Sequence, residues 1–203
     1  RWQLSLRDGR LRYSPNPELC LAMPNRNNGD ALQAVQCDGD GAKWWTFESI
    51  AIHNFSEKCV DMLWSSRKPG APIGVWDCVQ NQNQVWSVSR DGQVRLGEPS
   101  GALCWAAKSD QPGAPLVIRD CDRSDSQRFT FSDNKIRYRE LCLDLRPDAP
   151  LEQGKALPRT PKNGWHAEFW PCDAARNTQE FHFAGTISQR GKCMDSVHSR
   201  TWD

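Results

Sequence analysis

Cysteines recur along the chain in a regular pattern, and this repeat constrains the fold more than any other feature of the sequence. Each of five elements is a cysteine followed by an apolar residue, and the intervals between them are 39, 45, 38 and 51 residues. These cysteines, which open units one to five in order, are Cys20, Cys59, Cys104, Cys142 and Cys193. Because a unit of this size cannot bury its own apolar face, we expect several units to pack around one core.

A second cysteine and a Gln-x-aromatic element follow within the units. We expect each unit to be closed by one disulfide, and the expected pairs are Cys20–Cys37, Cys59–Cys78, Cys104–Cys121 and Cys142–Cys172. The Gln-x-aromatic residues are Gln84 and Trp86, Gln127 and Phe129, and Gln179 and Phe181, with Lys43-Trp44-Trp45 in the equivalent place of unit one. We expect the aromatic rings to lie in the core, and the glutamines to bond turn backbone groups rather than a ligand.

The remaining pattern within each unit is typical of short β-strands joined by turns. Runs such as Ile73-Gly74-Val75-Trp76 are separated by Asp-Gly and Pro-Gly pairs, which mark turns. No window shows a sustained helical period. The sequence therefore predicts an all-β fold.

The composition indicates in which compartment the protein is found and disfavours several classes of partner. Nine cysteines indicate an oxidising, secreted location, and the sequon Asn54-Phe55-Ser56 is compatible with it. No Cys/His spacing typical of zinc occurs, so neither a metal nor a cofactor is expected. Lys+Arg number 26 and Asp+Glu number 25, and they are scattered, which disfavours nucleic acid as a partner. The apolar runs are too short to cross a bilayer, so no membrane insertion is expected.

The repeated motifs resemble those of the ricin B-type lectin family, whose signature is a repeated Cys-Leu-Asp, Trp-x-Cys and Gln-x-Trp. The resemblance covers nearly the whole chain, and residues 50–184 look most like the lectin domain of the polypeptide GalNAc-transferases. It implies a β-trefoil, in which three units surround a pseudo-threefold axis, and a carbohydrate-binding function.

The resemblance also implies which residues bind sugar. In unit two they are Asp61, Trp76 and Asn83, and in unit four they are Asp144, Trp170 and Asn177, which adjoins Thr178 in the family's asparagine position. Unit two departs from the family at Gly74, and unit four carries an insertion over about residues 146–166 that we expect to cover or block its site. Units one and three have Ala22 and Val35, and Ala106 and Arg119, in the aspartate and aromatic positions, so we expect them to bind no sugar.

The number of units leaves the domain frame open. The first frame has a preceding repeat at 1–49, a trefoil at 50–184 and the start of a further repeat at 185–203. The second has a trefoil at 8–131 and a partial second trefoil at 132–203. Both are expected in a tandem array of trefoils. Cys193 opens unit five, and its expected partner would lie beyond Asp203, so we expect it to bond to a segment or subunit outside this sequence.

The function favoured by these observations is a lectin for terminal galactose or GalNAc on glycoproteins or glycolipids, acting in adhesion or targeting, including as the cell-binding part of a toxin. Two alternatives remain: an accessory lectin domain of a glycan-processing enzyme, and a lectin-like scaffold that binds proteins. A glycosidase needs two carboxyl groups at one scissile bond, whereas Asp61 and Asp144 belong to different lobes. We therefore expect no catalysis from this chain, although a catalytic domain outside it is compatible with the sequence.

Overall fold

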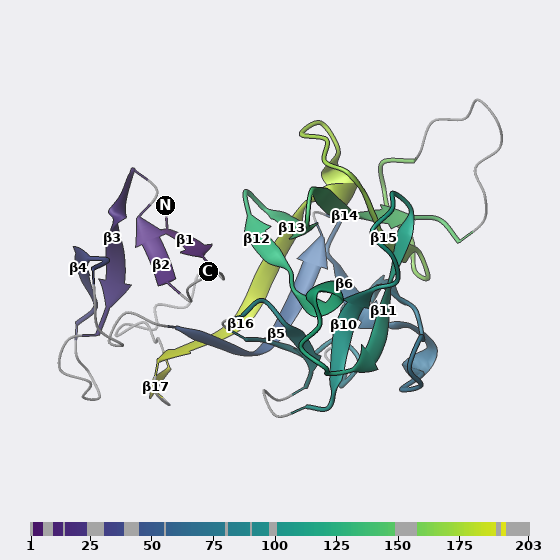
Figure 1. The fold of residues 1–203 in the computed structure, drawn as a ribbon, viewed down its shortest axis with the longest axis horizontal. Helices are drawn as coiled ribbons and strands as arrows, with labels where there is room; N and C mark the ends of the chain where they lie inside the picture. The colour runs from purple at the N-terminus through teal and green to yellow at the C-terminus, as the bar shows by residue number, and fades with distance from the viewer. Residues whose placement is uncertain are drawn as a thin grey trace, which may run out of the picture.

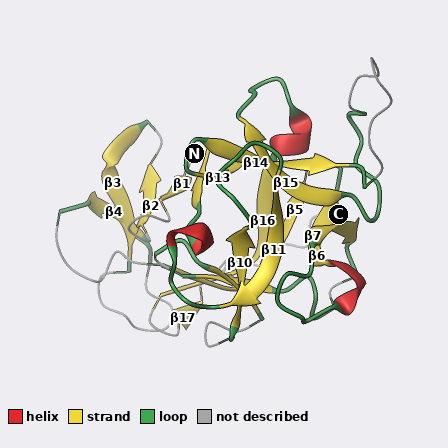
Figure 2. Cartoon of the chain, turned by 45° about the vertical axis from the view of Figure 1, so that its right-hand side comes forward, coloured by secondary structure: helices red, strands yellow, loops and turns green. Residues whose placement is uncertain are grey.

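The structure of the protein, a computed structural model, describes residues 2–5, 10–13, 15–23, 31–38, 45–54, 56–79, 81–89, 91–97, 101–148, 158–189 and 192–193. Within these residues the chain consists of β-strands and short 3-10 turns (Figure 2). The predicted all-β fold is confirmed. Of the described segments, none forms a helix long and apolar enough to cross a membrane.

The strands form two sheets, and Figure 1 shows the smaller one beside the main body. The smaller sheet contains β1 (Trp2–Ser5), β2 (Arg10–Tyr13), β3 (Asn16–Ala22) and β4 (Gln33–Gln36). The larger begins with β5 (Thr46–Asn54), β6 (Lys58–Met62), β7 (Ile73–Asp77), β8 (Trp86–Val88), β9 (Val94–Leu96), β10 (Leu103–Ala107) and β11 (Ala114–Asp120). It continues with β12 (Thr130–Ser132), β13 (Lys135–Tyr138), β14 (Leu141–Arg146), β15 (His166–Pro171), β16 (Phe181–Gln189) and β17 (Lys192–Cys193). Unit one therefore lies mainly in the smaller sheet and units two to four in the larger.

Units two, three and four contact one another in a cycle. In each of them a glycine turn approaches the second hairpin strand of another unit and donates a backbone hydrogen bond to it. The three bonds are Gly70 N to Ile118 O at 2.7 Å, Gly113 N to Phe169 O at 2.8 Å, and Gly164 N to Val75 O at 2.9 Å. The three glycines have φ values of 91°, 85° and 85°, a left-handed conformation that favours glycine. The cycle runs from unit two to three, from three to four and from four back to two.

Aromatic side chains from these three units fill the core. The Trp105 ring lies 5.2 Å from that of Trp86 and 6.0 Å from that of Phe129, and Phe129 stacks on Phe169 at 5.7 Å. Trp86 is fully buried, and its indole Nε1 donates to the Val60 carbonyl at 3.0 Å, which satisfies its polar atom. The aromatic residues of the repeat thus join the units across the centre of the molecule.

The four predicted disulfides are present. They join Cys20 to Cys37, Cys59 to Cys78, Cys104 to Cys121, and Cys142 to Cys172, with Cα–Cα separations of 5.0–5.1 Å. Each links a residue of one hairpin strand to the residue just after its partner strand, and such a link contributes about 3 kcal/mol in the loop-entropy account. The side chain of Cys193, at the end of β17, lies outside the described residues.

Candidate functional site: an open unit-two site and a covered unit-four site

The unit-two candidate site is built on the β6–β7 hairpin. Asp61 on β6 lies opposite Gly74 on β7, and Cys59 lies opposite Trp76, so the carboxylate and the indole occupy neighbouring strands. The Asp61 side chain is buried, and its Oδ2 accepts a hydrogen bond from Gln84 Nε2 at 2.8 Å. Burial raises the pKa of Asp61, although the Gln84 hydrogen bond acts in the opposite direction. The site therefore holds a carboxylate away from bulk water.

Gln84 holds the turn that follows β7. Its Oε1 accepts from the Val79 amide at 2.9 Å, and its Nε2 donates to the Asp77 carbonyl at 2.7 Å as well as to Asp61. Gln179 makes the same three contacts in unit four, to Asp173 N, Pro171 O and Asp144 Oδ2. The repeated glutamine thus fixes the backbone around each site and orients the carboxylate where one is present.

Trp76 and Asn83 complete the predicted unit-two residues. The Trp76 side chain is 40% exposed, which leaves part of its ring open to a ligand. Asn83 Nδ2 donates to Ser65 Oγ at 2.6 Å, and its backbone carbonyl accepts from Met62 N at 3.0 Å. Asp61, Trp76 and Asn83 are therefore all anchored on or beside one hairpin.

Packing explains why residue 74 of unit two is a glycine. A Cβ atom added there would lie 2.1 Å from the Trp165 carbonyl oxygen and 2.8 Å from Leu63 Cδ1. The same carbonyl accepts from the Val75 amide at 2.9 Å, and Asn163 Nδ2 donates to Asp77 Oδ2 at 2.7 Å. The C-terminal end of the unit-four insertion therefore packs against β7 of unit two, where it leaves no room for a side chain at position 74. Residues 149–157 of that insertion lie outside the described residues.

In unit four, Asp144 occupies the position that Asp61 has in unit two, but cations surround it. Asp144 on β14 lies opposite Glu168 on β15 and is fully buried. Its Oδ2 accepts from Arg146 Nη2 at 2.9 Å and lies 3.4 Å from Arg176 Nη1. Two of the protein's own arginines thus contact the Asp144 carboxylate.

Arg146 also covers the unit-four indole. Its Cζ lies over the Trp170 ring, 4.3 Å from the ring centroid, an arrangement typical of a cation–π contact. Trp170 Nε1 donates to Glu168 Oε2 at 3.0 Å. In the described part of the chain no hydrogen bond joins the Asn177 amide to Asp144, and the adjacent Thr178 is buried. The Arg146 guanidinium therefore contacts both the face of the Trp170 ring and the Asp144 carboxylate.

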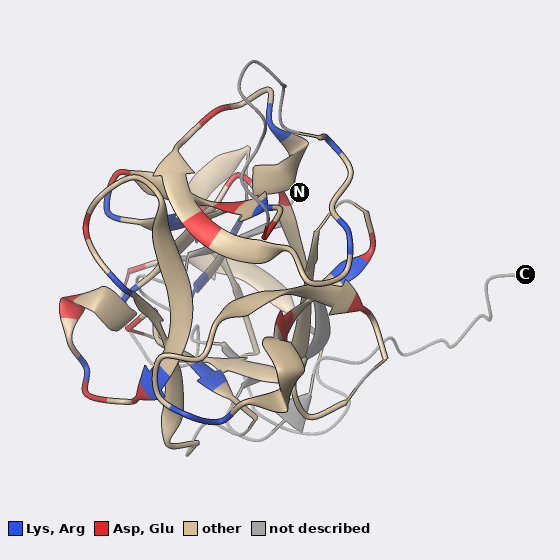
Figure 3. Cartoon of the chain, turned by 90° about the vertical axis from the view of Figure 1, so that its right-hand side faces the viewer, with Lys and Arg blue, Asp and Glu red and all other residues tan. Residues whose placement is uncertain are grey.

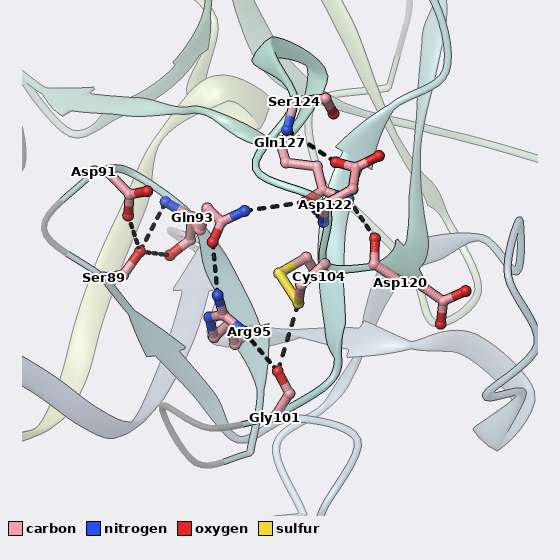
Figure 4. Close-up of a disulfide and its surroundings, with 11 residues drawn as sticks. Ser89, Asp91, Gln93, Arg95, Gly101, Cys104, Asp120, Asp122, Ser124 and Gln127 are labelled. Carbon is pink, nitrogen blue, oxygen red and sulfur yellow. Dashed lines mark hydrogen bonds between the residues drawn. A yellow bond between two sulfur atoms is a disulfide. The ribbon is translucent and has the colours of Figure 1, made fainter.

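Unit three has the same backbone arrangement but lacks the site's polar groups. Ala106 and Arg119 stand in the aspartate and aromatic positions. Figure 4 shows the glutamine of this unit, Gln127. Its Nε2 donates to the Asp120 carbonyl at 2.7 Å, and its Oε1 accepts from Gln93 Nε2 at 3.0 Å. In units two and four the glutamine instead bonds the side chain of an aspartate. Without a carboxylate and an aromatic ring, this position offers a hexose neither an anionic acceptor nor a stacking face.

Three further observations concern the sequon, the surface charges and the capacity to bind a metal ion. Asn54 is fully buried, with its Oδ1 accepting from Lys58 N at 3.1 Å and its Nδ2 inaccessible, so this fold leaves no room for a glycan at that nitrogen. Acidic and basic residues are interspersed over the face in Figure 3. Across the described ranges, no group of three or more His, Cys, Asp or Glu side chains is placed to hold a metal ion.

Sequence reasoning did not identify Ser65, which bonds Asn83, or Arg146, which bonds Asp144, as residues beside these sites. The repeat contained a signal for Arg146, because it lies four residues after Cys142, as Leu63 lies four residues after Cys59. Comparing these two positions shows a cation in unit four where unit two has a buried apolar residue.

These features, a three-unit β-trefoil in which two hairpins carry a buried carboxylate beside an aromatic ring, define a carbohydrate-binding lectin fold. The chain belongs to the ricin-type beta-trefoil lectin domain family, whose sequence profile matches residues 48–157. A search of curated protein sequences found no match.

Solved structures share the fold at low sequence identity. A non-toxic homologue of type II RIPs from Momordica charantia (bitter gourd), in complex with α-methyl-D-galactoside, is 17% identical with a TM-score of 0.53, and the match covers 90% of this chain and 66% of that one. The designed threefold-symmetric protein ThreeFoil is 16% identical with a TM-score of 0.52, covering 72% of this chain and 99% of that one. The agglutinin from Abrus precatorius is 18% identical with a TM-score of 0.50, and the match covers 90% of this chain and 65% of that one. The chain thus spans just under two thirds of the two plant proteins.

Proposed function

We propose that this protein is a lectin that binds terminal galactose or GalNAc on glycoproteins or glycolipids through Asp61, Trp76 and Asn83, and that it acts in adhesion or targeting. The observation that carries the proposal is the partly exposed Trp76 ring on the strand next to the buried Asp61 carboxylate. The ligand named for the bitter gourd structure, a galactoside, supports the choice of sugar.

The chemistry of these sugars matches the three side chains. Galactose and GalNAc present an axial 4-hydroxyl beside an apolar face of C–H groups. Asp61 accepts charge-assisted hydrogen bonds from hydroxyls, and the Asn83 amide both donates and accepts. The indole of Trp76 covers the C–H face and excludes water from it. The repeated Gln84 contacts keep the carboxylate in place before the sugar arrives.

Four further features belong to the proposal. The cyclic contacts of units two, three and four support 50–184 as the trefoil frame. The four disulfides support an extracellular location. Asp144, Trp170 and Asn177 form a second sugar site only when Arg146 leaves Trp170. The binding module itself performs no catalysis, and any enzymatic or toxic activity would belong to a further domain.

Titration calorimetry with methyl α-galactoside, with an asialo-glycoprotein as the multivalent ligand, tests the proposal. The wild-type protein is expected to bind the monosaccharide weakly and at one site. Asp61→Asn removes the charge at constant shape and should abolish most of the binding, whereas Asp120→Asn alters an exposed carboxylate of unit three and should leave it unchanged. Equal binding by wild type and Asp61→Asn, both folded by circular dichroism, would show that the site lies elsewhere.

A further inference from the structure

Trp64 is a large apolar residue that is exposed to solvent. Its side chain is 64% exposed, more than that of any other large hydrophobic residue described. It belongs to the 3-10 turn η2 (Leu63–Ser65), which directly follows β6 and its Asp61. Trp64 has φ 56° and ψ 21°, and Ser65 has φ 54°. Left-handed conformations of this kind cost free energy for residues with a Cβ atom, and a bulky residue is rare there.

Hydrogen bonds hold this turn in its unfavourable conformation. Leu63 N donates to Pro72 O at 3.2 Å, and Ser66 N donates to Leu63 O at 3.3 Å. Ser65 Oγ accepts from the Asn83 side chain, which ties the turn to a residue of the candidate site. Leu63 itself is fully buried, so the turn is anchored in the core. The chain therefore fixes the backbone that presents Trp64 beside the site.

Trp64 and Trp76 flank the same short segment of unit four. The Trp64 ring meets the His166 ring edge-on, with the centroids 5.9 Å apart. The Trp76 ring passes Gly164, with Cζ3 3.8 Å from where a Cβ atom would be. Gly164 and His166 are only two residues apart, and two residues of chain span at most about 7 Å, so the two exposed indoles contact the same short segment. His166 also pairs with Gly74, which in turn pairs with Asp61.

We propose that Trp64 is a specificity-determining residue that stacks on a second sugar ring, so that the preferred ligand of the unit-two site is at least a disaccharide. The inference rests on the proposed function: the terminal galactose or GalNAc lies on Trp76 and Asp61, and the sugar linked to it lies on Trp64. Because an exposed indole already offers an apolar face, it gains by covering the C–H groups of that second ring. The equivalent positions are Ser109 in unit three and Pro147 in unit four, so unit two alone among these three carries an aromatic ring there.

The test compares methyl α-galactoside with N-acetyllactosamine by titration calorimetry, using Trp64→Gly and Trp64→Phe. Wild type should bind the disaccharide at least five times more tightly than the monosaccharide. Trp64→Gly should reduce disaccharide affinity to the monosaccharide level and leave monosaccharide affinity within twofold. Trp64→Phe should keep most of the preference, because it keeps an aromatic face.

The glycine variant separates a ligand-binding role from a structural one. Glycine adopts the left-handed conformation without strain, so Trp64→Gly should raise the midpoint of thermal unfolding or leave it unchanged. A lower midpoint, an equal loss of affinity for both sugars, or a wild-type protein with no preference for the disaccharide would overturn the inference while leaving the lectin function in place. A wild-type protein that binds neither sugar would overturn the proposed function and this inference together.

Discussion

The unit-two and unit-four sites share a backbone and a motif, yet one is open and the other is covered. Both have an aspartate on the first hairpin strand, an indole on the second and a glutamine that bonds the carboxylate. At the position four residues after the first cysteine, unit two has the buried Leu63 and unit four has Arg146. Arg146 bonds Asp144 and lies over Trp170, so it makes the contacts that the proposed function assigns to a sugar. A complete motif therefore does not guarantee an available site.

Exchanging residues between the two sites tests this comparison, and the largest effect is expected at Gly74. Gly74→Glu gives unit two the residue that unit four has at position 168. Its Cβ would clash with the Trp165 carbonyl, which belongs to the backbone and has little room to move. We expect a loss of about 3 kcal/mol in the free energy of unfolding, at the upper end for overpacking. Urea denaturation measures it, and the reverse change Glu168→Gly should cost only about 1 kcal/mol. Equal losses would contradict the packing explanation.

Removing each indole in turn tests which site binds sugar. Trp76→Ala should weaken binding of methyl α-galactoside by about 2 kcal/mol, or roughly thirtyfold, because the ring supplies the stacking face. Trp170→Ala should change the affinity less than twofold, since Arg146 already covers that ring. Calorimetry on the two variants decides the point. A larger loss in Trp170→Ala than in Trp76→Ala would reverse the assignment of the open and covered sites.

The repeat carried enough information to predict an all-β fold and its four disulfides, and the resemblance to the ricin B-type lectin family implied the trefoil. Short strands, turn pairs and regularly spaced cysteines are local signals, and each recurs in several units. The repeat did not predict the cyclic contacts between units, because contacting residues such as Gly164 and Val75 are far apart in sequence. The requirement for glycine at position 74 arises from one of these long-range contacts and had no local signal.

Whether each site is open or covered was harder to predict than which residues belong to it. Asp144 and Trp170 stand in the same motif positions as Asp61 and Trp76, and the sequence distinguished unit four only by Thr178 and by the insertion over about residues 146–166. Whether Arg146 extends into solvent or turns onto Trp170 depends on side-chain packing, which motif spacing does not encode. The left-handed backbone of Trp64 is likewise unexpected, because tryptophan has no local preference for it.

Opening the covered site should give a gain of binding. Arg146→Leu installs in unit four the residue that unit two has, which frees the Trp170 ring and one donor contact to Asp144. We expect the stoichiometry for methyl α-galactoside to rise from one to two, with the new site weaker by about 1 kcal/mol because Arg176 still lies 3.4 Å from Asp144. Arg146→Lys, which keeps a cation there, is the matched control and should stay at one. An unchanged stoichiometry in a folded Arg146→Leu protein would show that Arg146 does not block the site.

The smallest expected effect is a pH dependence of the open site. In the proposed site sugar hydroxyls donate to the ionised form of Asp61, and burial raises the pKa of this carboxyl group above its ordinary value. Binding of methyl α-galactoside should therefore weaken a few-fold as the pH falls through this raised pKa, earlier than an exposed aspartate would allow.

The effect on stability has the opposite sign to the effect on binding. Because the folded state holds the Asp61 proton more tightly than the unfolded state does, protonation of this group stabilises the fold as the pH falls. Sugar binding should thus decline while the tryptophan fluorescence of the folded protein stays constant. In Asp61→Asn, which has no proton to gain, the residual binding should be flat over the same range. A decline of equal size in Asp61→Asn would assign the pH dependence to another group.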